Sequence, residues 1–331
     1  MKNLVTGGAG FIGSHVVDRL VQLGHEVVVY DNLSTGNIYN LDSVIGSGLA
    51  TFIDGDILDD KKLIKAMKGV TRVFHLAANA DVRGGIDNPI KDIRNNIIGT
   101  HSVLECMKVT GASEIVFTSS ATVYGEPTVF PTPESYAPIQ TSLYGASKLS
   151  AEAIIQAYSE YYGIRNYIFR FVSWLGERYS HGVVFDFVSK LKKNPEELEI
   201  LGDGKQTKSY LHVDDGIDGI FLVLDKSTKD STNIFNLGHI DYMGVKSVAI
   251  IVADEMRLKG VDFKFLGGNR GWIGDSPFVY LDTSKIQGLG FSPKIKIEDA
   301  IRRTVRYLLD NSWMLKKDQK IFNPLFKSKI V

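Results

Sequence analysis

The segment Thr6-Gly7-Gly8-Ala9-Gly10-Phe11-Ile12-Gly13-Ser14-His15 determines the first unit of the fold. It follows an apolar run at 3–6 that predicts a buried strand, and apolar residues then repeat at helical spacing over 12–23. Glycines three residues apart permit a tight turn and a close approach of the backbone to phosphate. An ordinary strand-to-helix loop can also be glycine-rich, but the strand before the motif and the helix after it favour a binding turn. The sequence therefore predicts a site for a dinucleotide diphosphate at Gly7, Gly10, Phe11, Ile12 and Gly13.

An acidic residue follows the second predicted strand, at 27–30. Asp31 stands at the distance from the glycine turn where a carboxylate binds the ribose of a dinucleotide. A carboxylate there also repels a 2′-phosphate, and the segment Asp31-Asn32-Leu33-Ser34-Thr35-Gly36 contains no arginine. The sequence therefore predicts NAD rather than NADP. The expected contacts of this segment are Asp31, Asn32, Ser34, Thr35 and Gly36.

Strands and helices alternate along the first half of the chain. Predicted strands cover 3–6, 27–30, 51–53, 73–76, 115–118 and 166–171, and long predicted helices cover 91–109 and 142–162. This alternation predicts an α/β fold with a doubly wound parallel sheet of the Rossmann type. Proline and glycine interrupt the pattern after residue 171. We place the NAD-binding domain at 1–171 and a smaller α/β substrate lobe at 172–331, with segments that can return to the first domain.

Further cofactor contacts are expected where the other strands end, because ligands of such sheets lie at the carboxyl edge. They are Asp56, Ile57, Leu76, Ala77, Ala78, Asn96 and Thr118. Asp56 faces the adenine or, equally well, caps the next helix. The small residues after the fourth strand let a cofactor pass, or simply pack. Asn96 lies inside a predicted helix, where asparagine is unfavourable, which indicates a buried role in holding the backbone or the cofactor.

The catalytic pattern combines a helical pair with a serine loop. Tyr144 and Lys148 are four residues apart in a predicted helix and share one face. A neighbouring ammonium and the positive nicotinamide ring favour the phenolate, which makes the tyrosine a general base. The Ser/Thr loop at 118–125 follows the fifth strand, where a hydroxyl can bind the reacting oxygen. Such a pair is commonly a solvated helix face, and such a loop commonly a turn. Following the glycine turn and Asp31 in this order, the pair and the loop are hard to explain except as a catalytic site.

Five motifs give the chain a family resemblance. They are TGGAGFIGSH at 6–15, DNLSTG at 31–36, SSATVYGE at 119–126, YGASK at 144–148 and SYLHVDD at 209–215. With them the chain resembles the extended short-chain dehydrogenases and, within these, UDP-galactose 4-epimerases and related nucleotide-sugar epimerases. The resemblance covers nearly the whole chain. It implies NAD and a UDP-sugar as ligands, a catalytic set of Ser120, Tyr144 and Lys148, and a place near the sugar for Thr122.

The resemblance also implies a reaction by oxidation and reduction. Tyr144 removes the proton of the sugar 4-hydroxyl while C4 gives a hydride to NAD⁺. The 4-keto sugar then rotates within the site, and the hydride returns to its other face. Dehydratases of this type carry Asp-Glu, and decarboxylases a glutamate, where this chain has Ala121 and Thr122. The sequence therefore favours a UDP-hexose 4-epimerase. The alternatives are a nucleotide-sugar 4,6-dehydratase, a UDP-glucuronate decarboxylase, or a non-catalytic NAD-binding sensor or scaffold.

The resemblance places the nucleotide diphosphate and the sugar against the second lobe. The expected substrate contacts are Ser120, Thr122, Tyr144, Ser173, His181, Gly182, Val183, Leu201, Lys208, Arg270 and Val279. Ser173 replaces an asparagine of the family and Lys208 an arginine, and lysine lacks the guanidinium fork for phosphate. Arg270 is expected to clamp the diphosphate. Val279 stands where a tyrosine restricts the pocket in relatives, which predicts room for a 2-acetamido group; a one-residue shift would place Tyr280 there instead.

Composition excludes several classes of partner. The 331 residues carry a formal net charge of +0, which gives no footprint for nucleic acid or a membrane surface. Cys106 is the single cysteine, so no intramolecular disulfide can form. No metal site is expected, no apolar run is long enough to span a bilayer, and no secretory leader precedes the first strand. We expect a cytoplasmic enzyme, and a homodimer that pairs through the helices at 91–109 and 142–162.

Overall fold

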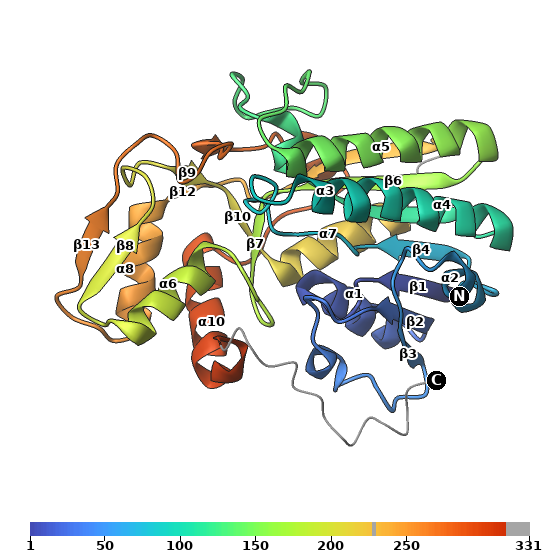
Figure 1. Ribbon diagram of the computed structural model, residues 1–331, viewed down its shortest axis with the longest axis horizontal. Coiled ribbons are helices and arrows are strands. Elements are labelled where there is room, and N and C mark those ends of the chain that lie inside the picture. Colours follow the sequence, from blue (N-terminus) through green and yellow to red (C-terminus); the bar gives the residue numbers. More distant parts are fainter. Residues whose placement is uncertain (227–229, 316–331) are drawn as a thin grey trace.

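Seven parallel strands form the central sheet of a large α/β body in the computed structural model, which describes residues 1–226 and 230–315 (Figure 1). These strands are β1 (Lys2–Thr6), β2 (Glu26–Asp31), β3 (Ala50–Asp54), β4 (Arg72–His75), β5 (Glu114–Ser120), β6 (Arg165–Phe171) and β11 (Thr232–Leu237). Their order is β11-β6-β5-β4-β1-β2-β3. The order reverses direction between β1 and β4, which is where ligands bind in such sheets. The predicted doubly wound parallel sheet is confirmed.

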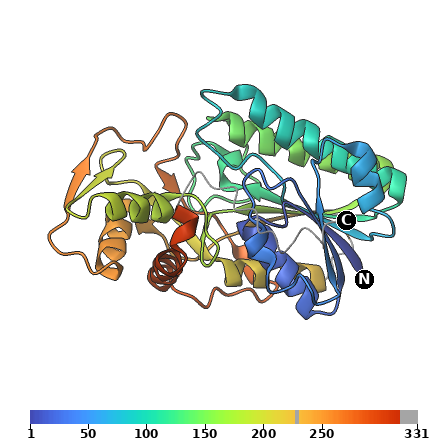
Figure 2. The same ribbon diagram turned by 60° about the horizontal axis from the view of Figure 1, so that its bottom comes forward.

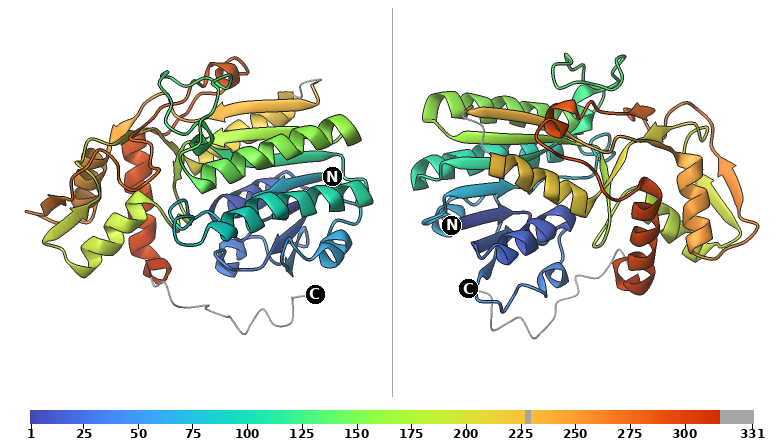
Figure 3. Two further views of the ribbon diagram at one scale, coloured as in Figure 1. Left: turned by 45° about the horizontal axis from the view of Figure 1, so that its top comes forward. Right: turned by 180° about the vertical axis from the view of Figure 1, so that it is seen from behind.

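Helices cover both faces of this sheet (Figure 3). One face packs against α2 (Asp60–Ala66), α4 (Gly99–Thr110) and α5 (Leu143–Tyr162), and the other against α1 (Phe11–Gln22) and α7 (Val213–Lys226). Neighbouring residues of one strand serve opposite faces: Leu4 packs with Leu104 and Ile155, whereas Val5 belongs to the core that contains Val17 and Ile220. Burial on both faces explains the continuous apolar runs at 27–30 of β2 and 115–117 of β5. Buried polar residues such as Arg170 of β6 have hydrogen-bond partners.

The smaller lobe stands beside the carboxyl edge of the sheet (Figure 2). Its helices α6 (Val183–Lys193), α8 (Val245–Glu255) and α10 (Ile297–Asp310) pack together, and β8 (Glu197–Ile200) pairs with β13 (Asp262–Phe265). Two small sheets join it to the body. One pairs β7 (Ser173–Leu175) with β10 (Tyr210–His212), and the other sets β9 (Thr207–Lys208) between β12 (Met243–Gly244) and β14 (Phe278–Val279). The remaining short helices are η1 (Ile38–Leu41), η3 (Ala121–Tyr124), α9 (Ser284–Gln287) and η4 (Ser312–Leu315).

Two features differ from the simplest interpretation of the sequence. The predicted helix at 91–109 begins earlier, as α3 (Pro89–Asp92), continues through a π-helical stretch, η2 (Ile93–Ile98), and becomes α4 only at Gly99. The strand β11 returns from beyond residue 171 to pair with β6, and α7 returns with it, so the large body draws on both sides of that position. The return of later segments to the first domain is expected from the sequence. The division at residue 171 itself stays a prediction. Within the described ranges, no helix is long and apolar enough to cross a bilayer.

Candidate active site

The glycine turn joins β1 to α1 and leaves the start of the helix open. Gly7 has a φ of +68°, and a Cβ there would lie 2.7 Å from the Ala77 nitrogen. A Cβ on Gly13 would lie 2.1 Å from the Gly7 carbonyl, so the packing of the turn itself requires these two glycines. Gly10 is the N-cap of α1 and makes no side-chain capping bond, which leaves the first-turn amides free for an anion. A diphosphate fits this turn, whose predicted contacts are Gly7, Gly10, Phe11, Ile12 and Gly13.

Asp31 ends β2 beside the turn. Its Oδ2 accepts a hydrogen bond from the Ala9 nitrogen at 2.9 Å, and its Oδ1 accepts one from the Leu33 nitrogen at 2.8 Å. Burial raises the pKa of the Asp31 carboxyl, and these two bonds oppose the shift. Gly36 lies against the same carboxylate, since a Cβ there would be 3.0 Å from Oδ2. The carboxylate is thereby held at the strand end where a ribose would lie, with Ser34 and Thr35 exposed next to it.

The structure excludes one of the two roles considered for Asp56, and the contact with adenine stays a prediction. The N-cap of α2 is Asp59, whose side chain accepts from the Lys62 nitrogen at 3.1 Å. The Asp56 carboxylate instead accepts from the Leu58 nitrogen at 2.9 Å and from Asn32 Nδ2 at 3.2 Å. The helix-cap alternative is therefore wrong, because Asp56 precedes the helix by a turn. Asp56 and Asn32 form an exposed polar rim, and Ile57 is buried.

The segment after β4 packs against the glycine turn. Leu76, Ala77 and Ala78 are half-buried there. Asn96, in the π-helical stretch η2, accepts from the Asn79 nitrogen at 2.8 Å and donates to Ser147 Oγ at 2.9 Å. Of its two possible roles, the hydrogen bonds of Asn96 support the one of holding the backbone: it ties this segment to α5. Insertions of a π turn often occur at functional sites.

The ends of β5 and α5 bring Ser120 and Tyr144 together. Ser142 caps α5 by accepting from the Gly145 nitrogen at 3.1 Å, which fixes Tyr144 in the first turn. Ser120 Oγ accepts from Thr122 Oγ1 at 2.9 Å and lies close enough to the Tyr144 phenol to lower its pKa. Burial and then the Asp92 carboxylate raise the pKa of Tyr144 to about 12, while the Ser120 hydroxyl lowers it. The phenol is therefore protonated at neutral pH in the protein alone.

Lys148 is buried at the end of β5, one helical turn after Tyr144. Its Nζ donates to the Thr118 carbonyl at 2.7 Å and lies 4.5 Å from the centre of the Phe117 ring. The charge is thus engaged by the end of β5 rather than by the phenol. Burial lowers the pKa of Lys148 to about 8, and the Glu152 carboxylate opposes this. The effect of this ammonium and of the positive nicotinamide ring on the phenolate stays a prediction.

The lobe contributes a second open helix start. Gly182 is the N-cap of α6 with a φ of +107° and no side-chain capping bond, and Val183 is the first residue of that helix. His181 is exposed beside it, and Ser173 is the exposed first residue of β7. Leu201 follows β8 near the Arg270 segment, because a Cβ on Gly271 would lie 3.9 Å from the Leu201 Cβ. Backbone amides at the start of α6 can bind phosphate as those of α1 can.

Both candidate phosphate-binding cations are held by carboxylates. Lys208 lies opposite Val279 in the β9–β14 pair, and its Nζ is 2.5 Å from Asp275 Oδ1. Arg270 forms an ion pair with Glu126, the residue that ends the SSATVYGE motif. To bind a diphosphate, each cation must exchange or share its carboxylate. Arg270 nevertheless connects the lobe directly to the loop that follows Ser120.

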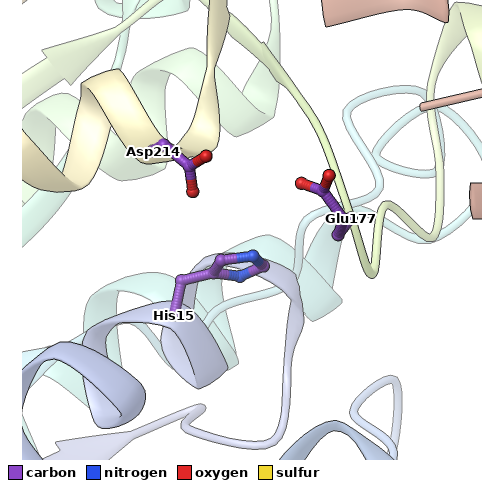
Figure 4. A group of neighbouring side chains, drawn as sticks. All are labelled: His15, Glu177 and Asp214. Carbon is purple, nitrogen blue, oxygen red and sulfur yellow. The ribbon is translucent and has the colours of Figure 1, made fainter. Parts of the chain in front are cut away.

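A third polar cluster lies where α1 meets the lobe. His15, Glu177 and Asp214 point toward one another (Figure 4). One ring nitrogen of His15 and one carboxylate oxygen of each acid lie within 4.8 Å of one another. Arg303 from α10 donates to Glu177 at 3.1 Å and to Asp214 at 3.2 Å. Because one guanidinium already compensates both carboxylates, we interpret the cluster as an ion-pair joint between body and lobe rather than a cation site.

Two buried acids near the catalytic set escaped the sequence analysis. Asp92 accepts from Asn79 Nδ2 at 2.7 Å, and its charge acts on Tyr144. Glu152 is fully buried and pairs with Arg170. A signal for Glu152 was available, because it stands four residues after Lys148 on the same helix face. Nothing in the sequence indicated that Asp92 is buried.

Taken with the parallel sheet, this geometry defines an NAD-dependent enzyme of the short-chain dehydrogenase type. The model of the NAD dependent epimerase/dehydratase family matches residues 3–238, and the chain belongs to this family. The UDP-glucose 4-epimerase of Halalkalibacterium halodurans is 35% identical over 267 residues, 75% of this chain and 78% of that protein. UDP-glucuronic acid decarboxylase 3 of Arabidopsis thaliana is 33% identical over 312 residues, 91% of this chain and 87% of that protein.

A solved structure extends the comparison to an acetylated sugar. The UDP-N-acetylglucosamine 4-epimerase of Methanobrevibacter ruminantium, in complex with UDP-N-acetylmuramic acid, superimposes with a TM-score of 0.84 at 29% identity. The alignment covers 94% of this chain and 98% of that one. The family resemblance stated from the motifs is therefore confirmed, and so is NAD as the cofactor.

Proposed function

We propose that this protein is a UDP-hexose 4-epimerase that accepts N-acetylated as well as unacetylated sugars. The observation that carries the proposal is the placement of Ser120 at the end of β5 and of Tyr144 in the first turn of α5, with Lys148 buried against the same strand end. A phenol and a hydroxyl placed in this way can bind one alcohol oxygen between them. The related UDP-glucose 4-epimerase supports the choice of substrate class.

The proposed chemistry moves one proton through Tyr144. The phenolate accepts the proton of the sugar 4-hydroxyl, and the Ser120 hydroxyl donates a hydrogen bond to the same oxygen as it becomes a carbonyl. NAD⁺ bound at the glycine turn and Asp31 would supply the acceptor for the hydride of C4 and the donor for its return. After the 4-keto sugar has rotated within the site, Tyr144 gives the proton back to the oxygen. Lys148 holds a positive charge under the site throughout.

A decarboxylase is the second candidate, because the Arabidopsis relative carries that name. The loop after Ser120 argues against it. Ala121 and Thr122 occupy the positions at which such enzymes need an acid or a base, and Thr122 Oγ1 is engaged by Ser120 Oγ at 2.9 Å. Assaying UDP-glucuronate for released carbon dioxide separates the two functions, since epimerisation releases none.

The directions in which Val279 and Tyr280 point, at the end of β14, support the proposal that acetylated sugars are accepted. Tyr280 donates from its hydroxyl to the Ile240 carbonyl at 2.9 Å and packs edge-on against Tyr242, on the side of the strand that Phe278 shares. Val279 must then point to the opposite side, because neighbours alternate in extended chain. A hollow of about 10 Å³ next to the catalytic loop is lined by Val279 and also by Phe278 and Tyr280, so the proposal rests on the size of the valine side chain rather than on an existing cavity. A valine there leaves volume that a tyrosine would fill.

The test compares four substrates in two proteins. The wild type is assayed on UDP-glucose, UDP-galactose, UDP-N-acetylglucosamine and UDP-N-acetylgalactosamine, and the assay is repeated with Val279→Tyr. We expect the variant to lose roughly 100-fold in kcat/KM on the acetylated pair, the scale of a pocket clash, and to keep its rate on the other pair. Val279→Ile is the control, since it adds a single methylene. A wild type active on UDP-glucose and UDP-galactose only would contradict the acetylated part of the proposal.

A further inference from the structure

A buried ion pair lies beneath the catalytic loop. Glu152, on α5, is 0% exposed, and Arg170 of β6 is 7% exposed. Arg170 Nη2 donates to Glu152 Oε2 at 2.7 Å, and its Nε donates to Oε1 at 3.1 Å. The helix and the strand that carry the pair run side by side in the body (Figures 1 and 3). A buried ion pair is weak evidence for stability because desolvation offsets the attraction. A role in the geometry of the site is the better explanation for its presence.

The pair holds the catalytic loop at both ends. On one side Ser119 Oγ donates to Glu152 Oε1 at 2.5 Å. On the other side Arg170 Nη1 donates to the Tyr124 hydroxyl at 3.0 Å, and that hydroxyl donates to Asn236 Oδ1 at 2.6 Å. Ser120 therefore lies in a short segment whose two ends are fixed by one ion pair.

The same carboxylate lies one helical turn from Lys148. Burial lowers the pKa of the ammonium to about 8, and Glu152 is the neighbour that raises it. His75 of β4 also faces the ammonium but is neutral, because burial lowers its pKa to about 3. From β5 the ammonium meets the Thr118 carbonyl and the Phe117 ring.

Three further groups surround this arrangement. Arg170 of β6 lies on the far side of Glu152 and offsets part of the carboxylate charge. Tyr144 precedes Lys148 by one turn on α5, and Asp92 of α3 acts on Tyr144.

We propose that Glu152 is a positioning residue of the reaction: paired with Arg170, it fixes the loop that carries Ser120 and places a negative charge one helical turn from Lys148. The proposal rests on the proposed function, because it concerns the same site. Glu152 touches neither the cofactor nor the sugar in this assignment and acts through Ser119, Lys148 and Tyr124.

The first test is Glu152→Gln, with Glu160→Gln as the control on the exposed end of the same helix. We expect kcat to fall roughly 100-fold while KM changes less than about twofold, because the loop positions a group that acts in the transition state. The alkaline decline of kcat should move to lower pH, since the charge that raises the pKa of Lys148 is lost. Glu152→Asp keeps the negative charge and should return the alkaline decline to the pH at which the wild type shows it. A folded Glu152→Gln protein with the wild-type kcat and pH profile would overturn the proposal.

Two further measurements test the proposal even if Glu152→Gln does not fold or the wild type is inactive on UDP-hexoses. NMR of ¹³C-labelled lysine side chains, with Lys148→Met to identify the signal, follows the titration of Lys148 without substrate; an unchanged titration in Glu152→Gln overturns the electrostatic part. If Glu152→Gln does not fold, Ser119→Ala leaves the ion pair intact and removes one anchor. We then expect roughly tenfold lower kcat at unchanged KM, and wild-type kcat overturns the positioning part. A wild type inactive on every UDP-hexose would refute the proposed function, whereas the lysine titration would still test Glu152.

Discussion

The phenol of Tyr144 is the single group on which the proposed proton transfer depends. We expect Tyr144→Phe to lower kcat by roughly 100- to 10,000-fold, the range for loss of a general base. The ring remains to fill its half-buried position, so the fold and the NAD content should not change. A coupled epimerase assay and analysis of the nucleotide released on denaturation measure the two effects. Tyr161→Phe, an exposed position on the same helix, is the control. A near-wild-type rate in Tyr144→Phe would exclude this tyrosine as the base.

Lys148 should set an alkaline limit on activity. Burial lowers its pKa to about 8, so the ammonium is present below that pH and is lost as the pH rises through it. We therefore expect kcat at saturating substrate to be level near neutrality and to decline above about pH 8. Lys148→Arg keeps its charge at all working pH values and should show a lower kcat without this decline. An unchanged decline in Lys148→Arg would assign the titration to another group.

At the scale of elements, the start of α1 is the part most directly committed to NAD. Gly10 has a φ of −77° and its added Cβ would meet only the Gly7 carbonyl, at 3.1 Å, so alanine fits the fold. The methyl group would nevertheless occupy space at the open helix start. We expect Gly10→Ala to weaken NAD binding at least about tenfold, because the motif serves the close approach of backbone to diphosphate. Calorimetric titration measures this, with Gly288→Ala as the control. Unaltered affinity would show that the diphosphate binds elsewhere.

The elements that the sequence predicted carry a recognisable pattern of apolar residues, and those it missed carry none. The strands of the large sheet are continuous apolar runs, and α5 begins at its cap Ser142. The π-helical stretch η2 has no such signature: one extra residue in a turn leaves the apolar spacing almost unchanged, and only the misplaced Asn96 indicated something unusual. In the lobe, strands such as β9 and β14 have two residues each, too few for an alternation to appear.

At the scale of the whole molecule, what remained unpredictable is contact between distant segments. The motifs gave Ser120, Tyr144 and Lys148 because each lies on a recognisable element. The partnership of Glu152 with Arg170, or of Arg270 with Glu126, depends on how those elements pack, which spacing along the chain does not encode. The joint between body and lobe has the same character: Asp18 of α1 meets Arg178 at 2.7 Å across 160 positions of sequence.

The exposed faces of α4 and α5 carry the prediction of a homodimer. Ile90 of α3 and Ile93 and Ile98 of η2, in the helical segments that lead into α4, are 61%, 37% and 47% exposed. Tyr158 of α5 donates to Glu105 of α4 at 2.5 Å, so the two long helices lie side by side. A continuous apolar face of this kind is self-complementary about a two-fold axis. We expect light scattering at micromolar concentration to give a dimer, and Ile98→Glu to give a monomer because burying an unpaired charge at the interface is costly. Ile250→Glu on α8, with a matched exposure of 49%, should remain dimeric. A monomeric wild type, or equal dissociation of both variants, would count against pairing through α4 and α5.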